Sequence, residues 1–279
     1  MHTLAIVGLG LLGGSVAAAA RSRRLAARYL GYDRDPQVCE LAQRLGLVDA
    51  AGPDLTDALG AAEVVVICTP VASVVATVER VLPLLAPGSL ITDTASTKSS
   101  IAATASRLAA ARGCAFVGAH PLAGSQQSGC LHARADLFAG RLTVLTPTAD
   151  NTPAQIERAS AFWQSLGAQV RPMSPEDHDR ALAFTSHLPH LLASALIGCI
   201  PLEWLGVSGP GLRDTTRIAA SQPTLWADIF LDNRLALMLA VDAFRHRLDH
   251  LTSSLAAADR ERLLHLLQEG KDVRDQLGS

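Results

Sequence analysis

Short apolar stretches alternate with helix-like segments over the first 173 residues of the chain. Seven stretches predict β-strands, at residues 4–7, 29–32, 64–68, 90–92, 116–118, 141–147 and 168–172. Between them, helices are predicted for an alanine-rich segment that begins at Ser15 and for residues 38–45, 73–85, 99–111 and 154–166. Continuous apolar strands that alternate with helices are typical of a parallel sheet with both faces covered. We therefore predict a doubly wound α/β domain with right-handed crossovers.

After residue 173 the pattern changes to helices, with almost no strand signal between them. The helices predicted here are residues 174–200, 224–255 and 259–277. Ser174 should cap the first of them, and Pro189 should kink it or open a turn near residues 187–190. We therefore expect an α/β domain over residues 1–173 followed by an all-helical domain over residues 174–279.

The helical domain is rich in Leu, Ala, Ile and Met and poor in aromatic residues. Its apolar surface exceeds what one small bundle easily buries. We therefore expect a homodimer that shares this domain, because a second copy would cover the surplus.

The first strand runs directly into a glycine-rich turn, Gly8-x-Gly10-x-x-Gly13, with Leu11 and Leu12 between the last two glycines, and then into a helix. One glycine permits the tight turn, the second lets the backbone approach a pyrophosphate, and the third lets helix and strand pack closely. The free N–H groups at the helix N-terminus then bind the anion. A strand, glycine turn and helix in this order predict a Rossmann-type domain that binds NAD or NADP.

The acidic residue at the end of the second strand bears on the choice between these cofactors. Asp33 lies twenty positions after Gly13, where a carboxylate would bind the adenosine ribose hydroxyls. It favours NAD because it would repel a ribose 2′-phosphate. Arg34 could offset that repulsion, or it could be solvated and paired with Asp35. We expect NAD, with NADP still possible.

Ligands of open α/β sheets bind at the carboxyl ends of the strands. Thr69 and Pro70 follow one strand and should line the cofactor. Ser96 and Lys98 follow the next strand, where a hydroxyl and an ammonium could meet the substrate or the phosphates. The alternative for Ser96 is that it caps the helix that follows.

His120 is the sharpest catalytic candidate. It lies at the carboxyl end of a predicted strand, beside Pro121 and before the small residues 123–125. Oxidation of an alcohol by NAD removes a hydride from carbon and a proton from oxygen, and neutral imidazole accepts a proton near neutral pH. A loop histidine is often structural, but the predicted cofactor nearby favours catalysis.

The helical domain supplies polar residues that could face the same cleft. His187 and His190 are three residues apart and would share a helix face. We expect no metal there, because no third ligand is evident. Arg213 and Arg217 are four apart, and a guanidinium binds carboxylates bidentately. Arg213 could instead pair with Asp214.

Composition excludes several classes of function. The chain of 279 residues is 49% hydrophobic and 18% charged, with a formal net charge of −2. This charge balance does not indicate binding to nucleic acid or to a membrane surface. No apolar run suggests a transmembrane span or a signal peptide. Five scattered cysteines without CxxC spacing suit free thiols in a reducing cytoplasm. We expect a cytoplasmic, metal-free protein that binds a small-molecule substrate.

Taken together, these motifs resemble those of the prephenate/arogenate dehydrogenase family of tyrosine biosynthesis. The resemblance runs in order through GLGLLGGS, GYDRDP, ICTPV, DTASTKSS, GAHPLAGSQQSG, DHDRALAFTSHLPH and GLRDTTRIA…PTLWADIFLDN. It implies that His120 accepts the proton of a ring hydroxyl, with Ser96 hydrogen-bonded beside it, and that Arg217 binds a substrate carboxylate. The further residues that it implies in the substrate pocket are His187, His190 and Trp226. It also implies a dimer through the helical domain.

The reaction implied by the resemblance is the oxidative decarboxylation of a cyclohexadienol, in which the nicotinamide takes a hydride, carbon dioxide leaves and the ring becomes aromatic. An acid near residues 125–128 could pair with the ammonium of arogenate, but this chain has Gln126 and Gln127 there. We expect Gln126 to contact the substrate. Neutral glutamines leave both substrates open, with a lean towards prephenate or dual use. Because the chain stops at Ser279, we expect any inhibition by tyrosine to act at the active site.

Three other functions fit parts of the pattern. A hydroxyacid dehydrogenase or imine reductase would share the two-domain plan, but its proton-transfer group is commonly a lysine or aspartate of the second domain. A relative that acts on amino-deoxyprephenate also fits. A nucleotide-sensing scaffold without turnover would have lost His120 or Arg217, and both are present.

Overall fold

A six-stranded parallel sheet forms the centre of the N-terminal domain in the computed structural model, which describes residues 1–124 and 127–277. The strand order is β3-β2-β1-β4-β5-β6. The strands are β1 (Thr3–Val7), β2 (Arg28–Tyr32), β3 (Ala50–Gly52), β4 (Val64–Ile67), β5 (Leu90–Asp93) and β6 (Ala115–Phe116). This is the order of a Rossmann-type doubly wound domain, so the predicted fold class is confirmed. The three-residue strand β3 was not predicted.

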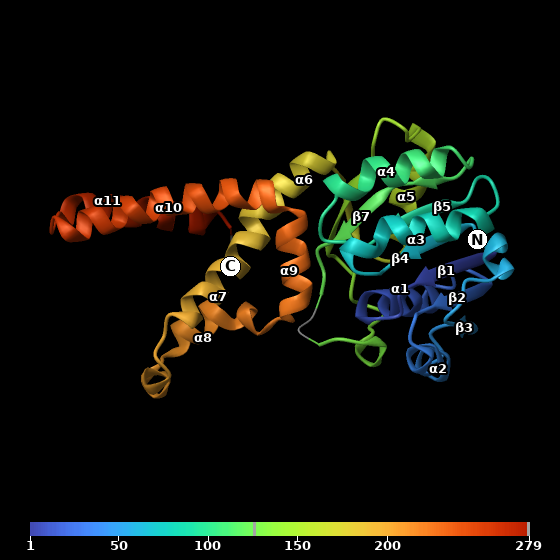
Figure 1. Ribbon diagram of the computed structural model, residues 1–279, viewed down its shortest axis with the longest axis horizontal. Coiled ribbons are helices and arrows are strands. Elements are labelled where there is room, and N and C mark those ends of the chain that lie inside the picture. Colours follow the sequence, from blue (N-terminus) through green and yellow to red (C-terminus); the bar gives the residue numbers. More distant parts are fainter. Residues whose placement is uncertain (125–126, 278–279) are drawn as a thin grey trace.

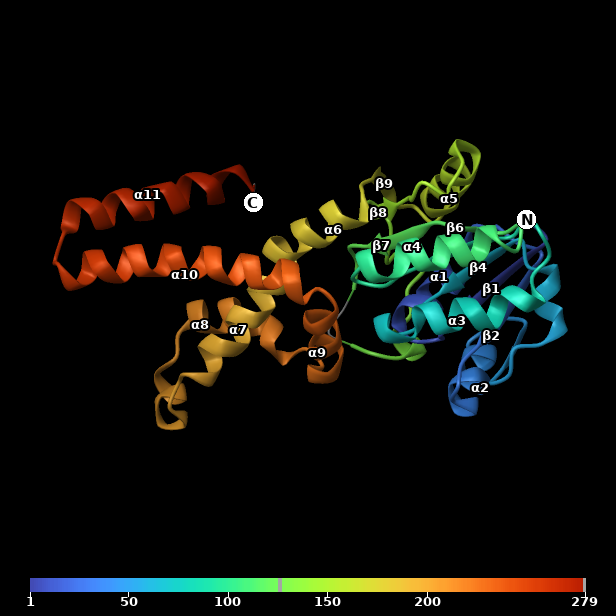
Figure 2. The same cartoon turned by 45° about the horizontal axis from the view of Figure 1, so that its top comes forward.

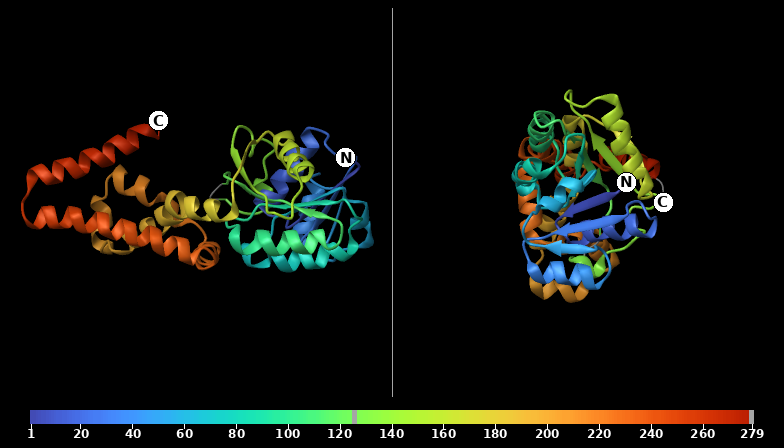
Figure 3. Two further views of the ribbon diagram at one scale, coloured as in Figure 1. Left: turned by 90° about the horizontal axis from the view of Figure 1, so that it is seen from above. Right: turned by 90° about the vertical axis from the view of Figure 1, so that its right-hand side faces the viewer.

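Helices cover both faces of this sheet (Figures 1 and 3). In β1 the side chains alternate, so that Leu4 and Ile6 belong to one core cluster and Ala5 and Val7 to the other. The first face packs against α1 (Leu11–Ser22), α2 (Pro36–Arg44) and α5 (Pro153–Ser165), and the second against α3 (Val74–Val81) and α4 (Ser99–Ala110). Every residue of β1, β4, β5 and β6 is therefore buried, as the continuous apolar stretches predict.

The predicted strand at residues 116–118 is wrong as a single element. The chain leaves the large sheet after Val117 and starts a second sheet, in which β7 (Gly118–Pro121) is antiparallel to β8 (Leu142–Thr146) and β8 is parallel to β9 (Gln169–Pro172). The reason lies in Asp93, whose side-chain Oδ1 accepts the Ala119 N–H at 2.9 Å. A carboxylate thus takes the place of the backbone carbonyl that a continued strand would use.

The second domain is helical, as expected. Its α-helices are α6 (Pro175–Leu182), α7 (Leu188–Gly198), α8 (Pro210–Thr216), α9 (Pro223–Asp232), α10 (Arg234–Ala256) and α11 (Arg260–Gln276), and a π-helical segment, Ala183–His187, joins α6 to α7. This segment interrupts the predicted long helix just before Pro189, which has no N–H to donate to the preceding turn. The predicted helix at residues 224–255 is broken at Asn233, and α8 was not predicted.

The helical domain extends from one end of the α/β domain, with α10 and α11 side by side (Figures 1 and 2). Its own core cluster contains four buried residues, Ala183, Leu188, Leu237 and Ala240. Many of its large apolar side chains are exposed, and examples are Leu202, Val207, Leu231, Leu235, Leu239, Leu255 and Val273. A monomer therefore leaves much of this apolar surface uncovered.

One helical stretch in the described part of the chain, Pro175–Gly198, is long and apolar enough to cross a membrane by length and composition alone. In the folded chain it comprises α6, the π-helical segment and α7. Asp179 of this stretch accepts hydrogen bonds from the Lys98 and Ser99 N–H groups of the α/β domain. The stretch is thus part of the junction between the two domains.

Candidate active site

A cavity of about 430 Å³ lies at the carboxyl ends of β1, β2 and β4. Among the residues that line it are six of the predicted cofactor residues, Gly8, Gly10, Asp33, Arg34, Thr69 and Pro70. Such an edge is where open α/β sheets bind their ligands. The structure thus gathers residues from three separate loops into one cofactor-sized space.

The glycines of the turn each meet a different steric demand. Gly8 has φ +95°, and a Cβ there would lie 2.6 Å from the Cys68 carbonyl oxygen. A Cβ on Gly13 would lie 1.9 Å from the Gly8 oxygen, so this glycine allows α1 to pack against β1. A Cβ on Gly10, by contrast, would meet no atom within 4 Å among the described residues other than its chain neighbours. A side chain at Gly10 would therefore occupy space that the fold leaves open for a ligand.

Polar groups in this cavity also fit a dinucleotide. Asp33 is fixed in place because its Oδ2 accepts the Leu9 N–H at 2.8 Å and its Oδ1 accepts the Asp35 N–H at 3.1 Å. Thr69 Oγ1 is buried, with no hydrogen-bond partner among the described residues. A buried polar atom of this kind normally has a partner, which a bound ligand would supply.

Three of the predicted cofactor residues, Leu11, Leu12 and Gly13, do not line the cavity. They lie in the first turn of α1, which begins at Leu11, and the Leu12 side chain packs against the core. Their part in cofactor binding stays a prediction. What these residues offer an anion is the backbone N–H groups of the first helical turn, where neither an acidic residue nor a capping side chain competes. Arg34 lines the cavity, while the Asp35 carboxylate caps α2 by accepting the Gln37 N–H at 2.9 Å.

A second cavity, of about 700 Å³, lies between the two domains. The α/β domain contributes Ser96, His120, Leu122, Gly124 and Gln127, and the helical domain contributes His187, His190, Arg217, Leu225 and Trp226. Six of the predicted catalytic and substrate residues therefore line one space: Ser96, His120, His187, His190, Arg217 and Trp226. Gln126 lies outside the described residues.

His120 is on β7, and its ring is held by a second imidazole. His120 Nδ1 is 2.9 Å from His178 Nε2. Burial lowers the pKa of His120 well below its usual value, and His178, the Lys98 ammonium and His187 lower it further. The ring is therefore neutral at pH 7, which is the form that accepts a proton.

Lys98 does not face either cavity, and that expectation was wrong. Its side chain is completely buried and forms an ion pair with Asp93. Burial lowers the pKa of Lys98, and Asp93 opposes this shift. Ser96 does not cap α4 either: Lys98 is the N-cap residue, and the Lys98 and Ser99 N–H groups donate to the Asp179 carboxylate at 2.8 Å each. Ser96 is instead left to face the substrate cavity.

The helical side of the cavity carries one guanidinium and an aromatic stack. Arg217 begins the 3₁₀ turn Arg217–Ala220 directly after α8 and lines the cavity, whereas Arg213, in the last turn of α8, does not. The His190 ring stacks on Trp226, with ring centroids 3.4 Å apart and planes inclined by 20°. His187 meets the same indole edge-on at 6.2 Å. The two histidines thus share one wall, as their spacing predicts.

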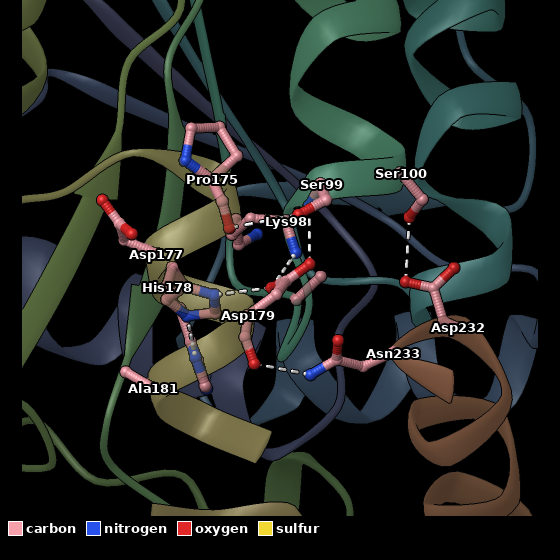
Figure 4. Close-up of polar contacts among 12 residues, drawn as sticks. Lys98, Ser99, Ser100, Pro175, Asp177, His178, Asp179, Ala181, Asp232 and Asn233 are labelled. Atoms are coloured by element: carbon pink, nitrogen blue, oxygen red, sulfur yellow. Dashed lines mark hydrogen bonds and ion pairs between the residues drawn. The ribbon is translucent and has the colours of Figure 1, made fainter. Parts of the chain in front are cut away.

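Sequence reasoning missed several residues of the junction. His178, Asp179 and Asn233 are almost fully buried and hydrogen-bonded to one another or to pocket residues (Figure 4). The segment DHD that contains two of them looks like the solvated first turn of a helix. No periodicity in the sequence distinguishes its buried members from the exposed Asp177.

We expect acid to destabilise the fold through the pocket histidines. Burial lowers the pKa of both His187 and His190 from the usual 6.5 to about 4. Between these values the unfolded chain binds protons that the folded chain does not, so stability is lost as the pH falls through this window. The slope is about 1.4 kcal/mol per pH unit for each fully shifted histidine.

Urea unfolding at a series of pH values between 7 and 4.5 measures this slope. His190→Asn should make it shallower, whereas the exposed His250→Asn should leave it unchanged. Equal slopes in the wild type and His190→Asn would show that His190 titrates alike in the folded and unfolded chains.

The fold and the two cavities define a class of protein. The chain has a Rossmann-type domain with an open cofactor cavity, and a second cavity that is lined by both a neutral imidazole and a guanidinium. This is the arrangement of a two-domain dehydrogenase that uses a nicotinamide dinucleotide.

Comparison with known proteins gives the family. Residues 16–171 match the model of the prephenate dehydrogenase nucleotide-binding domain, and residues 174–269 match that of the prephenate dehydrogenase dimerization domain. The cyclohexadienyl dehydrogenase of Zymomonas mobilis is 36% identical over 279 residues, which cover 97% of this chain and 94% of that protein. The chain therefore belongs to the prephenate dehydrogenase family and is a dehydrogenase.

Solved structures agree with this assignment. The prephenate dehydrogenase of Aquifex aeolicus, in complex with hydroxyphenyl propionate and NAD+, superposes with a TM-score of 0.92 at 31% identity, covering 99% of this chain and 98% of that one. The arogenate dehydrogenase of Synechocystis superposes with a TM-score of 0.85 at 34% identity and covers 99% of both chains. The expected fold, family and enzyme class are thus confirmed.

Proposed function

We propose that this chain carries out the NAD-linked oxidative decarboxylation of prephenate, arogenate or both, in tyrosine biosynthesis. The observation that carries the proposal is that His120 and Arg217, from different domains, line the same cavity. A base for a ring hydroxyl and a cation for a carboxylate are the two groups that such a substrate requires. Relatives named for prephenate, arogenate and cyclohexadienyl substrates support the same reaction.

The cofactor cavity fits NAD. The turn at Gly8, Gly10 and Gly13 and the first N–H groups of α1 would hold the pyrophosphate, and Asp33 would bind the ribose hydroxyls. Thr69 and Pro70 would line the dinucleotide. When bound, the nicotinamide supplies the acceptor for the hydride. Asp33 favours NAD over NADP, and Arg34, which lines the same cavity, could reduce this preference.

His120 moves the proton. As the hydride leaves the hydroxyl-bearing carbon of the substrate, the neutral imidazole of His120 accepts the hydroxyl proton. A C=O bond forms at that carbon. Loss of the ring carboxylate as carbon dioxide then returns an electron pair to the ring, and the phenolate oxygen recovers the proton from His120. Ser96 lines the same cavity and would orient the hydroxyl by a hydrogen bond. Aromatisation of the substrate ring supplies the driving force of the reaction. The protein therefore needs only to position the substrate and to transfer this proton.

The helical wall would hold the rest of the substrate. Arg217 would bind a carboxylate, and the stacked His190 and Trp226 would offer a flat surface to the ring. His187 would contact the substrate from the same wall. Gln126 is proposed as a further contact, and a neutral amide there is compatible with either a keto acid or an amino acid side chain.

We also propose that the active form is a homodimer in the cytoplasm. The dimer is supported by the dimerization-domain match and by the exposed apolar side chains of α10 and α11. The balanced composition, with a net charge of −2, supports neither a nucleic-acid partner nor a membrane surface.

A direct assay tests the reaction. The purified chain is mixed with prephenate, arogenate or a simple hydroxyacid, each with NAD and with NADP, and reduced cofactor is followed by absorbance. We expect turnover with prephenate or arogenate, a higher kcat/KM with NAD, and none with the hydroxyacids. Turnover of hydroxyacids alone would replace this proposal with a hydroxyacid dehydrogenase.

A further inference from the structure

Asp179 is the centre of a buried hydrogen-bond network at the domain junction (Figure 4). Its Oδ1 accepts the Lys98 N–H at 2.8 Å and His178 Nδ1 at 2.7 Å, and its Oδ2 accepts the Ser99 N–H at 2.8 Å. Burial alone would raise the pKa of this carboxyl, but the hydrogen bonds from His178 and Ser99 outweigh it and lower the pKa. Asp179 is therefore an ionised, fixed acceptor.

The first branch of the network leads to His120. Because a carboxylate only accepts hydrogen bonds, His178 Nδ1 must carry a hydrogen. A neutral His178 then presents a lone pair on Nε2 to His120 Nδ1, 2.9 Å away. His120 must donate from Nδ1, which leaves its Nε2 without a hydrogen.

The second branch leads to His187. Asn233 Nδ2 lies 2.8 Å from the Asp179 carbonyl oxygen and 3.0 Å from His187 Nδ1. The carbonyl accepts only, so the group that faces it must be the NH₂ of Asn233. The second hydrogen of this NH₂ points to His187 Nδ1, which must accept it. The hydrogen of the neutral His187 ring is therefore on Nε2.

The surroundings of His187 Nε2 are consistent with a hydrogen-bond donor whose acceptor would come from a bound molecule. This atom is buried and has no hydrogen-bond partner in the described part of the chain, although the residue lines the substrate cavity. An unpaired buried donor is costly, so an acceptor atom of a bound molecule would be favoured there.

We propose that Asp179 is a positioning residue that fixes His120 and His187 in opposite tautomers, one with a free Nε2 lone pair and the other with an Nε2–H. The cavity then offers an acceptor for the hydroxyl hydrogen and, on the helical wall, a donor for a substrate oxygen. Asp179 and Asn233 belong to the helical domain and His120 to the α/β domain, so this pattern depends on the docking of α6 against α4. The role of His120 as base rests on the proposed function, whereas the tautomers themselves do not.

Nuclear magnetic resonance of the 15N-histidine-labelled wild type, without substrate at pH 7.5, tests the tautomers directly. Long-range 15N–1H correlations distinguish a protonated Nδ1 from a protonated Nε2, and His120→Asn and His187→Asn assign the two rings. We expect Nδ1–H in His120 and Nε2–H in His187. A cationic His178 would donate to His120 instead, and an Nε2–H in His120, or an Nδ1–H in His187, would overturn the proposal.

Asp179→Asn tests the link to turnover, with Asp177→Asn, an exposed carboxylate of the same helix, as matched control. We expect kcat to fall at least about tenfold and the acid limb of the kcat/KM profile to move to lower pH, because a developing charge on His120 loses its counter-charge. The other charged or titratable groups around His120 are Lys98 with its partner Asp93, His178 and His187.

The outcomes separate this proposal from the proposed function. If Asp179→Asn leaves the tautomer of His120 and the pH profile unchanged, the Asp179 carboxylate has only a structural role and the proposal fails. The tautomer of His187 should not change in this variant, because it depends on the backbone carbonyl of Asp179. If that variant does not fold, the spectra of the wild type still decide. If the wild type turns over neither prephenate nor arogenate, the proposed function fails, while the same spectra still judge the tautomers.

Discussion

Replacement of His120 by asparagine is expected to lower kcat at least about 100-fold, the range for loss of a general base. Asparagine keeps a polar side chain on β7 but cannot take the hydroxyl proton as the hydride leaves. The ring that it replaces is neutral at pH 7 because burial and neighbouring positive charge lower its pKa. The measurement is steady-state turnover with the better of prephenate and arogenate at saturating NAD.

The control for this variant is His246→Asn, which changes an exposed histidine of α10 away from both cavities. It should keep the wild-type kcat. Circular dichroism and NAD affinity should be unaltered in both variants, because His120 does not line the cofactor cavity. An unaltered kcat in His120→Asn would remove this residue from the role of base.

Replacement of Arg217 by alanine is expected to raise KM by about 10- to 100-fold with kcat within about threefold. A charge-assisted hydrogen bond to a carboxylate contributes about 1.5–3 kcal/mol, and 1.4 kcal/mol corresponds to a factor of ten. Because the carboxylate that Arg217 grips is present in the bound substrate and in the transition state, its loss weakens both equally. Initial rates over a wide range of substrate concentration give the two constants.

Arg213→Ala is the matched control, because it also removes an arginine side chain, four residues earlier in the chain and outside the cavity. It should leave KM nearly unchanged. A fall in kcat alone for Arg217→Ala would mean that the guanidinium acts in the chemical step and not as a ground-state clamp. Equal effects of the two substitutions would point to a general change in the charge of the domain surface.

The α/β domain could be predicted largely from sequence because its strands are buried on both faces. A parallel strand inside the sheet has no polar side, so apolar stretches such as residues 64–68 mark it directly. The prediction failed at residues 116–118, where Asp93 accepts the Ala119 N–H and ends the pairing. A side chain 26 residues away decides that break, and no local pattern contains it.

The site residues also differ in how well the sequence predicts them: those that local spacing defines could be identified, and those whose position depends on tertiary contacts could not. Gly8, Gly10, Asp33 and Thr69 are identifiable because a dinucleotide needs short loops at strand ends, and the structure gathers them. The place of Lys98 in such a loop predicts that its ammonium could meet the substrate or the phosphates. Lys98 instead forms a buried ion pair with Asp93, five residues earlier. The buried ammonium therefore does not contact a ligand in either cavity.

By itself the sequence determined the dinucleotide fold, the succession of two domains and the identity of His120, Ser96 and Arg217 as candidates, because each rests on local spacing or on a chemical group that the reaction needs. Only the tertiary structure decided that His178, Asp179 and Asn233 surround the pocket histidines and that Lys98 is buried. These contacts join residues up to 81 positions apart across a domain junction, as in the bond from Lys98 N–H to Asp179. Packing sets which atom of each side chain faces which neighbour, and no local pattern of the sequence contains that information.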